Sequence, residues 1–228
     1  MAKIVIDARI INSSTGRYIE RVLTNLQNID SDNKYVVLVR KKDADYWKPT
    51  ADNFSVKVAE YDQFSLGEQF GFALFLYKLK ADLVHFCMPQ QPIFYLRPSI
   101  TTMHDLILLK TYNSDKNWFI YHFKQTIGRF VFWYLAHKSR FIISPSEASR
   151  KEYLDRYSIK PEKVVTTHLA ADTNNETPKK IDLPYKKFIT YVGQQSDYKN
   201  VKRLVQAHQL LLKTQPELGL ILVGGMND

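Results

Sequence analysis

The sequence predicts an α/β protein built on a doubly wound parallel sheet. Short runs rich in Val, Ile and Phe alternate with longer segments of helical period, which is the pattern of strands joined by helical crossovers. Several of these runs are apolar throughout, as expected of strands covered on both faces. The chain has 228 residues, enough for one such domain and part of another.

The first domain is expected to contain seven strands and four helices. The last helix has a clear start, because Ser144 and Ser146 can cap free amides, Pro145 fixes the entry and Glu147 suits the positive end of the helix dipole. Strands are predicted at 3–7, 35–39, 56–58, 83–86, 100–103, 141–144 and 164–167, and helices at 16–27, 66–80, 117–137 and 146–157.

A second, shorter α/β segment follows a polar linker. The linker, 172–187, is rich in proline, asparagine and mixed charge. Then come a strand at 188–193, a helix at 201–213 and a strand at 220–225. Two strands and one helix bury too little surface to be an independent domain. We therefore expect a complete domain at 1–185 and the opening of an incomplete one at 186–228.

Composition narrows the class of protein and of partner. The chain carries 32 Lys and Arg against 23 Asp and Glu, a formal charge of +9, which favours an anionic partner such as a phosphorylated small molecule, an acidic membrane surface or nucleic acid. The basic residues are dispersed and form no known nucleic-acid motif, so no nucleic acid is expected. No apolar run approaches the roughly 20 residues that span a bilayer. A single cysteine, Cys87, and an N-terminus without signal-peptide features predict a cytoplasmic protein.

Two loops carry the residues best suited to chemistry in the first domain. His104 and Asp105 follow an apolar run in "ITTMHDL", where a strand would deliver a proton-handling pair to the carboxyl edge of the sheet. An ordinary polar loop pair is the competing interpretation. Gly16, at the start of the first helix, would let backbone approach a phosphate, although a plain capping turn explains it equally well.

The second segment offers a further phosphate site, and one helix offers a membrane contact. Lys199 lies near a helix start just beyond Gly193, a suitable place to bind a diphosphate, although a solvated lysine is the simpler alternative.

The histidines show no metal-ligand spacing, so no metal is expected. The aromatic and basic segment 116–140 is first a core helix and second a surface that rests on anionic lipid.

Taken together, these stretches resemble the retaining glycosyltransferases of the GT-B fold, family 4. The resemblance is carried by "STGRYIERVL", "DLVHF" with "TTMHDL", "FIISPSEASRKEYL" and "FITYVGQQSDYKNVKRLVQAHQLL", in this order. It implies two Rossmann-like domains, an acceptor-side domain followed by a nucleotide-sugar domain. It also implies transfer of a sugar, mannose or glucose, to a saccharide or lipid-linked acceptor with retention and without a cofactor or metal.

The resemblance also assigns residues. It implies that the loop of Gly16 and Arg17 approaches the donor phosphates and the acceptor, and that His104 lies beside the reacting sugar. The adjacent acid, Asp105, is expected to orient that histidine or to bind a sugar hydroxyl. Ser146 and Glu147 match the region after the strand that faces the other domain. Gly193 and Lys199 match the donor-phosphate loop, whose lysine neutralises the departing diphosphate.

Two departures from that family shape the expectation. Gln194 stands where the family has an arginine after the glycine, and an amide cannot replace a guanidinium fork. Most of the donor domain is absent from the sequence, so this chain alone is expected to be inactive. The alternatives are a truncated transferase, a half-protein that pairs with a donor domain or a second copy, and a non-catalytic carbohydrate- or phosphate-binding module. The expected location is the cytoplasm, with a peripheral position at the inner face of the cell membrane as a further expectation.

Overall fold

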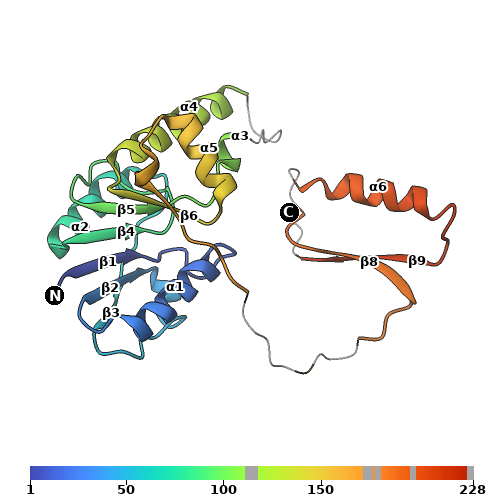
Figure 1. Cartoon of the computed structure of the whole chain (residues 1–228), viewed down its shortest axis with the longest axis horizontal. Helices are drawn as coiled ribbons and strands as arrows, with labels where there is room; N and C mark the ends of the chain where they lie inside the picture. Colours follow the sequence, from blue (N-terminus) through green and yellow to red (C-terminus); the bar gives the residue numbers. More distant parts are fainter. Residues whose placement is uncertain (111–117, 172–176, 178–180, 196–198, 225–228) are drawn as a thin grey trace. The chain divides into compact units, whose positions relative to one another are not determined.

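The computed structural model describes residues 1–110, 118–171, 177, 181–195 and 199–224, which form two units (Figure 1). The first unit comprises Met1–Lys110 and Trp118–Ala171. The second contains β8 (Lys187–Val192), α6 (Val201–Leu211) and β9 (Leu218–Val223), with β8 and β9 paired in parallel. The expected domain boundary at 185/186 lies just before β8, whereas these two units divide after Ala171.

The first unit is built on a parallel sheet, as the sequence predicts. Among the described residues seven strands pair in the order β3-β2-β1-β4-β5-β6-β7, with every pairing parallel. Strand order reverses between β1 and β4, and ligands of such sheets bind beyond the carboxyl ends of the strands near this reversal. The strands are β1 (Lys3–Asp7), β2 (Lys34–Val39), β3 (Phe54–Val58), β4 (Leu83–Phe86), β5 (Ser99–Thr102), β6 (Phe141–Ser144) and β7 (Val164–Thr166).

Helices cover both faces of this sheet. Alternate residues of a strand point to opposite faces. Ile6 packs in one cluster with Ile19 and Leu23 of α1, whereas Val5 packs in another with Leu76 of α2. The helices are α1 (Gly16–Ile29), α2 (Ala73–Leu79), α3 (Ile107–Lys110), α4 (Trp118–Lys138) and α5 (Glu147–Tyr157), with short helical turns η1 (Lys41–Asp43), η2 (Gly67–Phe72) and η3 (Pro161–Lys163).

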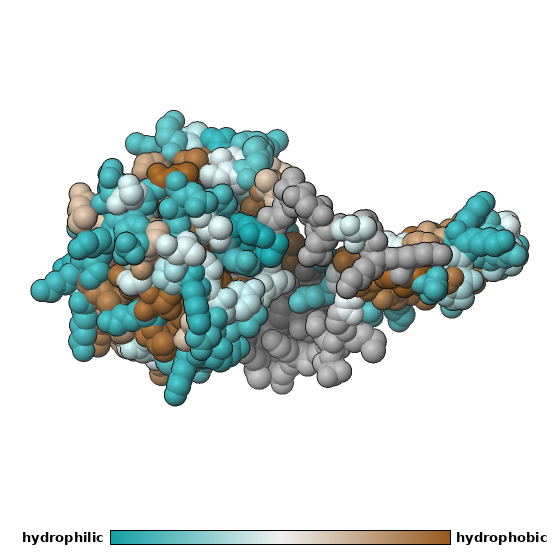
Figure 2. Space-filling model, turned by 90° about the horizontal axis from the view of Figure 1, so that it is seen from below, coloured by the Kyte–Doolittle hydropathy of each residue, from teal (hydrophilic) through white to brown (hydrophobic). Residues whose placement is uncertain are grey.

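A third cluster of buried side chains joins α4 and α5 to β6 and β7. It contains Leu135 and Ala136 of α4, Tyr153 of α5, Ile142 and Val164. Strand register places Ile142 and Val164 on the α2 face of the sheet. Figure 2 shows that hydrophobic residues also reach the surface of each unit among hydrophilic ones.

Where predicted and observed elements differ, backbone hydrogen bonding explains the difference. The strand predicted at 35–39 begins at Lys34, whose N–H donates to the Ala2 carbonyl at 2.9 Å, and the strand predicted at 100–103 is Ser99–Thr102. Hydrogen bonding between strands thus includes the polar residues Lys34 and Ser99, which a prediction based on apolar runs does not include. The helix predicted at 66–80 is a π-helical turn, η2, followed by α2. The ends of the helix predicted at 117–137 and of the strand predicted at 220–225 lie partly outside the described residues.

Candidate active site

The site residues predicted in the first unit gather at the carboxyl edge of its sheet. Gly16 begins α1 after β1, His104 and Asp105 follow β5, and Ser146 and Glu147 follow β6. This is the edge where α/β sheets bind ligands. Gly193 and Lys199 belong to the second unit, after β8 and before α6.

His104 is held by contacts from three neighbouring segments. Its Nε2 lies 3.1 Å from the carbonyl oxygen of Cys87, which follows β4. The ring of Tyr18 on α1 meets the imidazole edge-on, with 5.0 Å between centroids. The backbone carbonyl of His104 accepts a hydrogen bond from Ser149 Oγ at 3.1 Å. The imidazole is therefore fixed in position at the sheet edge.

These contacts also fix the protonation of His104. Burial lowers the pKa of His104 below its ordinary value, and the Cys87 carbonyl and Asp105 oppose this shift without cancelling it. The ring is therefore neutral at pH 7. Because a carbonyl oxygen can only accept, the proton lies on Nε2 and donates to Cys87, which leaves Nδ1 with a free lone pair. Nδ1 is thus a hydrogen-bond acceptor suited to a hydroxyl group.

A buried chain of polar groups lies beneath Tyr18. His85 Nε2 is 2.8 Å from Thr102 Oγ1, which is 3.1 Å from the Tyr18 hydroxyl. Burial lowers the pKa of His85 to about 4, so this imidazole is neutral too. Burial raises the pKa of Tyr18 to about 12, which keeps its phenol protonated. The chain therefore positions Tyr18, and through its ring His104, without placing a charge in the core.

Gly16 is required by the shape of its own loop. A Cβ at this position would lie 1.9 Å from the Ile11 carbonyl oxygen, a distance no side chain tolerates. The Gly16 N–H donates to the carbonyl oxygen of Ser13 at 3.0 Å and to its hydroxyl at 3.1 Å. The loop thus needs glycine for packing, and the Gly16 N–H is already satisfied. Arg17, the next residue, pairs with Glu20 at 3.6 Å.

Ser146 caps α5, as the sequence predicts. Its Oγ accepts the Ser149 N–H at 3.1 Å and donates to Ser149 Oγ at 3.1 Å. Since Ser149 Oγ donates in turn to the His104 carbonyl, the cap of α5 is coupled to the loop after β5. Ser144 donates to the Ser146 carbonyl instead of capping an amide. Glu147 is exposed and pairs with Arg150 at 3.6 Å.

Asp105 has a structural contact of its own. Its Oδ1 accepts the Ile107 N–H at 2.9 Å, at the start of α3. The side chain is exposed, and the group that orients the His104 imidazole is the Cys87 carbonyl. The structure therefore places Asp105 at the edge as a capping residue.

In the second unit, two glycines allow β8 and β9 to end close together. Gly193 and Gly224 have φ of +150° and +144°, values that side-chain-bearing residues rarely adopt. A Cβ on Gly224 would lie 2.0 Å from the Gly193 carbonyl oxygen. Gln194 is exposed, and its carbonyl accepts the Tyr191 hydroxyl at 2.7 Å. Lys199 lies two residues before α6.

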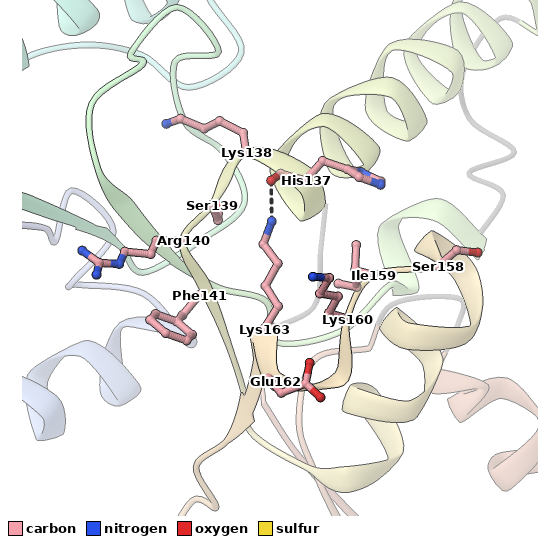
Figure 3. Close-up of a pocket in the computed structure, with 10 residues that line it drawn as sticks. All are labelled: His137, Lys138, Ser139, Arg140, Phe141, Ser158, Ile159, Lys160, Glu162 and Lys163. Atoms are coloured by element: carbon pink, nitrogen blue, oxygen red, sulfur yellow. Dashed lines mark hydrogen bonds between the residues drawn. The ribbon is translucent and has the colours of Figure 1, made fainter.

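A pocket of about 630 Å³ lies at the opposite, amino edge of the sheet (Figure 3). Two of its basic side chains hold the fold together: Lys163 Nζ donates to the His137 carbonyl at the end of α4, where a cation suits the helix dipole. Lys138 Nζ donates to Ser99 Oγ at 3.0 Å. In Figure 3 the side chains of Lys138 and Arg140 extend away from Lys163, so these three cations do not converge on one point.

Sequence reasoning missed Tyr18, Thr102, Ser149 and the role of His85. Two signals were available. Thr102 lies two residues before His104, so the alternation of a strand directs its side chain away from Thr101 and toward the α1 face. His85 pairs in register with Ile6 and Ile100 on that face. Neither signal identifies the partner on α1, because that contact depends on how the helix packs.

The described residues contain neither a metal-binding cluster nor a membrane-spanning helix. No group of three or more His, Cys, Asp or Glu side chains in this part of the chain is placed to hold an ion. No helix within the same residues is long and apolar enough to cross a membrane.

Comparison with known protein families gives one match that covers most of the chain. Residues 40–175 match the family model described as Glycosyltransferase Family 4. This range includes β3 to β7 and therefore His104, Asp105, Ser146 and Glu147. No curated protein matches the chain in sequence.

Solved structures share the fold at low sequence identity. The Anabaena Alr3699/HepE structure in complex with UDP and glucose aligns over 100% of this chain and 62% of its own, with a TM-score of 0.59 and 15% identity. The S. aureus MnaA-UDP structure aligns over 100% of this chain and 63% of its own, with a TM-score of 0.55 and 13% identity. The lipopolysaccharide outer core galactosyltransferase WaaB aligns over 99% of this chain and 69% of its own, with a TM-score of 0.53 and 10% identity. The chain thus spans less than two thirds of the first two proteins, and the likeness confirms the expected GT-B fold.

Proposed function

This chain belongs to glycosyltransferase family 4, and we propose that it forms the acceptor-side domain of a retaining transferase. In this proposal a sugar, mannose or glucose, passes from a nucleotide-sugar to a saccharide or lipid-linked acceptor. UDP bound to two structures of the same fold supports a nucleotide-sugar donor. The observation that carries the proposal is the neutral, fixed imidazole of His104 at the carboxyl edge of the sheet.

The reaction explains why a neutral acceptor suits this position. Transfer with retention develops positive charge on the anomeric carbon and negative charge on the leaving phosphate. Cations near that phosphate lower the barrier, the role we assign to Lys199 and Arg17. An imidazolium beside the sugar would repel the positive charge. A neutral His104 instead accepts a sugar hydroxyl at Nδ1 and orients the ring without that repulsion.

The test is nucleoside diphosphate release from a panel of UDP- and GDP-sugars. We expect none from this chain alone, because β8 and β9 offer only part of a donor site, and release from a longer protein that contains it. In that protein His104→Ala should lower kcat/KM about 100-fold. The exposed His168→Ala is the matched control and should leave the rate unchanged. Equal rates for the two variants would remove His104 from the reaction.

Gln194 favours a second candidate function, a non-catalytic carbohydrate- or phosphate-binding module. The exposed amide at this position carries no charge to offset a departing diphosphate. A binding module would retain saccharides in every longer form without releasing nucleoside diphosphate. Gln194→Arg separates the two: it should accelerate release by a transferase and leave a binding module inactive.

We also propose a peripheral contact between α4 and anionic lipid. Phe130 and Trp133 on this helix are each about half exposed, at 53% and 50%, and Arg129 on the same helix is exposed. Aromatic side chains and cations together suit a lipid interface. Vesicles of phosphatidylglycerol should retain the protein, and Trp133→Ser should weaken retention, whereas Phe188→Ser in β8 should not. Equal retention by phosphatidylcholine vesicles would contradict the contact.

A further inference from the structure

A second hollow opens at the carboxyl edge of the first sheet, on the other side of β1 from His104. It has a volume of about 170 Å³ and lies where the loop after β1, the turn η1 after β2 and the segment after β3 come together. The resemblance assigns none of its side chains a role. They are Arg9, Ile10, Asn12, Ser13, Arg40, Lys42, Asp43 and Gln63.

A buried ionic cluster forms one wall of this hollow. The Arg9 guanidinium donates two hydrogen bonds of 2.8 Å to Asp7, one of 2.8 Å to Glu68 and one of 2.9 Å to the Tyr61 carbonyl. It also lies 3.8 Å from the centre of the Phe72 ring. Burial would lower the pKa of Arg9, but the two carboxylates outweigh it and hold the charge in place. Arg9 thus fastens the segment after β3 to the end of β1.

The same cluster holds Phe64 in an unfavourable backbone conformation. Phe64 has φ of +59°, which is rare for a bulky residue. Its N–H donates to Glu68 Oε2 at 2.8 Å, the oxygen that Arg9 leaves free. The Phe64 side chain is nevertheless 77% exposed. The chain therefore sustains backbone strain to present an aromatic ring to solvent, which is typical of a functional position.

The chemistry of the hollow suits the hydroxyl groups of a neutral sugar. Asn12 Nδ2 donates to Asp43 Oδ1 at 3.1 Å, which leaves the Asn12 carbonyl and the second Asp43 oxygen as acceptors. The Lys42 ammonium has no partner among the described residues and can donate. Arg40 is already paired with Glu60 and Asp62, at 2.8 and 2.7 Å, so it does not select an anion.

From these observations we propose that this hollow binds one hexopyranose unit of the acceptor. Asn12, Lys42 and Asp43 hydrogen-bond its hydroxyls, and Gln63 and Ser13 border it. Phe64 directly follows the lining residue Gln63, and its exposed ring is the stacking partner that this proposal assigns to the apolar face of the sugar. The inference rests on the proposed function, which it deepens: the acceptor is a saccharide and not a bare lipid alcohol.

The test measures saccharide binding by this chain, without a donor. The probes are the methyl glycosides of glucose, galactose, mannose and N-acetylglucosamine, titrated by NMR. At least one should bind, with intermolecular NOEs between its C–H protons and the Phe64 ring. Phe64→Ala should weaken that binding at least tenfold. Phe94→Ala is the matched control, because Phe94 is also exposed, at 48%, but lies on another loop, stacked on Phe70.

Phe64→Gly separates binding from folding. Glycine accepts positive φ without strain, so this variant should melt about 2–4 °C higher while binding no glycoside. Absence of binding by all four glycosides, or equal binding by Phe64→Gly and the wild type, would overturn the inference. The proposed function is judged separately by nucleoside diphosphate release. Release by the longer protein without glycoside binding by this chain refutes only this subsite. Glycoside binding by this chain without release by the longer protein refutes only the transferase.

Discussion

At the scale of single residues, burial decides which groups of the site carry charge. His85 on β4 is buried on the α1 face of the sheet, and burial lowers its pKa from 6.5 to about 4. A neutral His85 accepts or donates one hydrogen bond with Thr102 and adds no charge beneath Tyr18. The neutrality of the site is therefore part of the stability of the fold, and it can be measured as such.

The first prediction concerns stability at acid pH. Between pH 6.5 and 4 the unfolded chain binds a proton at His85 and the folded chain does not, so stability falls as pH falls through this window. At about 1.36 kcal/mol per pH unit, His85 accounts for a loss of roughly 3 kcal/mol. Urea unfolding at several pH values should show a shallower dependence for His85→Gln. His168→Gln at an exposed position controls for the substitution itself, and an identical slope in both variants would contradict the prediction.

The second prediction tests the close approach at Gly16. Gly16→Ala should lower the melting temperature substantially, because its Cβ would overlap the Ile11 carbonyl and force the loop after β1 to move. Gly128→Ala in α4 is the matched control: its Cβ would meet only Leu109 Cδ2, at an ordinary 3.5 Å, and alanine favours a helix. In thermal unfolding, Gly16→Ala should therefore lower the melting temperature and Gly128→Ala should raise it. An unchanged melting temperature for Gly16→Ala would show that the loop after β1 adapts to the added Cβ.

At the scale of elements, α5 couples helix capping to the position of His104. Its N-terminus is closed by Ser146, whose partner Ser149 also donates to the His104 carbonyl. Its C-terminus ends at Ser158 in the left-handed conformation, with φ of +50°. A small substitution at the first end should therefore lower the free energy of unfolding, and one at the second end should raise it.

The third prediction uses these two ends. Ser146→Ala should lower the free energy of unfolding by about 1 kcal/mol, because the Ser149 amide loses its cap. Ser158→Gly should raise it by up to about 1 kcal/mol, because glycine adopts positive φ without strain. In NMR spectra Ser146→Ala should also shift the His104 resonances, whereas Ser158→Gly should not. His104 shifts of equal size in both variants would count against coupling through Ser149.

Elements with a strong local signal were predictable, and contacts between distant elements were not. β1, β4 and β6 begin and end at the predicted residues, since apolar runs between polar residues mark them clearly. The Ser146 cap follows from its position before Glu147. By contrast, Arg9 and Glu68 are 59 residues apart in sequence, and their contact depends on the path of the chain between β3 and η2. The strain at Phe64 is a consequence of that contact and has no local sequence signal.

At the scale of the whole molecule, the two units differ in how well they bury their strands. The last three residues of β1 are buried, and β1 is flanked by β2 and β4 and covered by helices. Every residue of β8 is at least partly exposed, and Val192 is 74% exposed. A two-stranded sheet with one helix is marginal in water.

The fourth prediction follows from this difference. Amides of β8 such as Ile189 and Tyr191 should exchange with deuterium at least 100-fold faster than those of Val5 and Val84, because local opening of β8 and β9 exposes little apolar surface. Hydrogen exchange of the intact chain measures both units in one sample. If a second copy completes the open edge of β9, as strand edges allow, exchange in β8 should slow as protein concentration rises. Fast exchange at every concentration would argue against a second copy as the partner of β9. Protection of β8 equal to that of β1, independent of concentration, would contradict the predicted difference, because the two-stranded sheet would then be stable by itself.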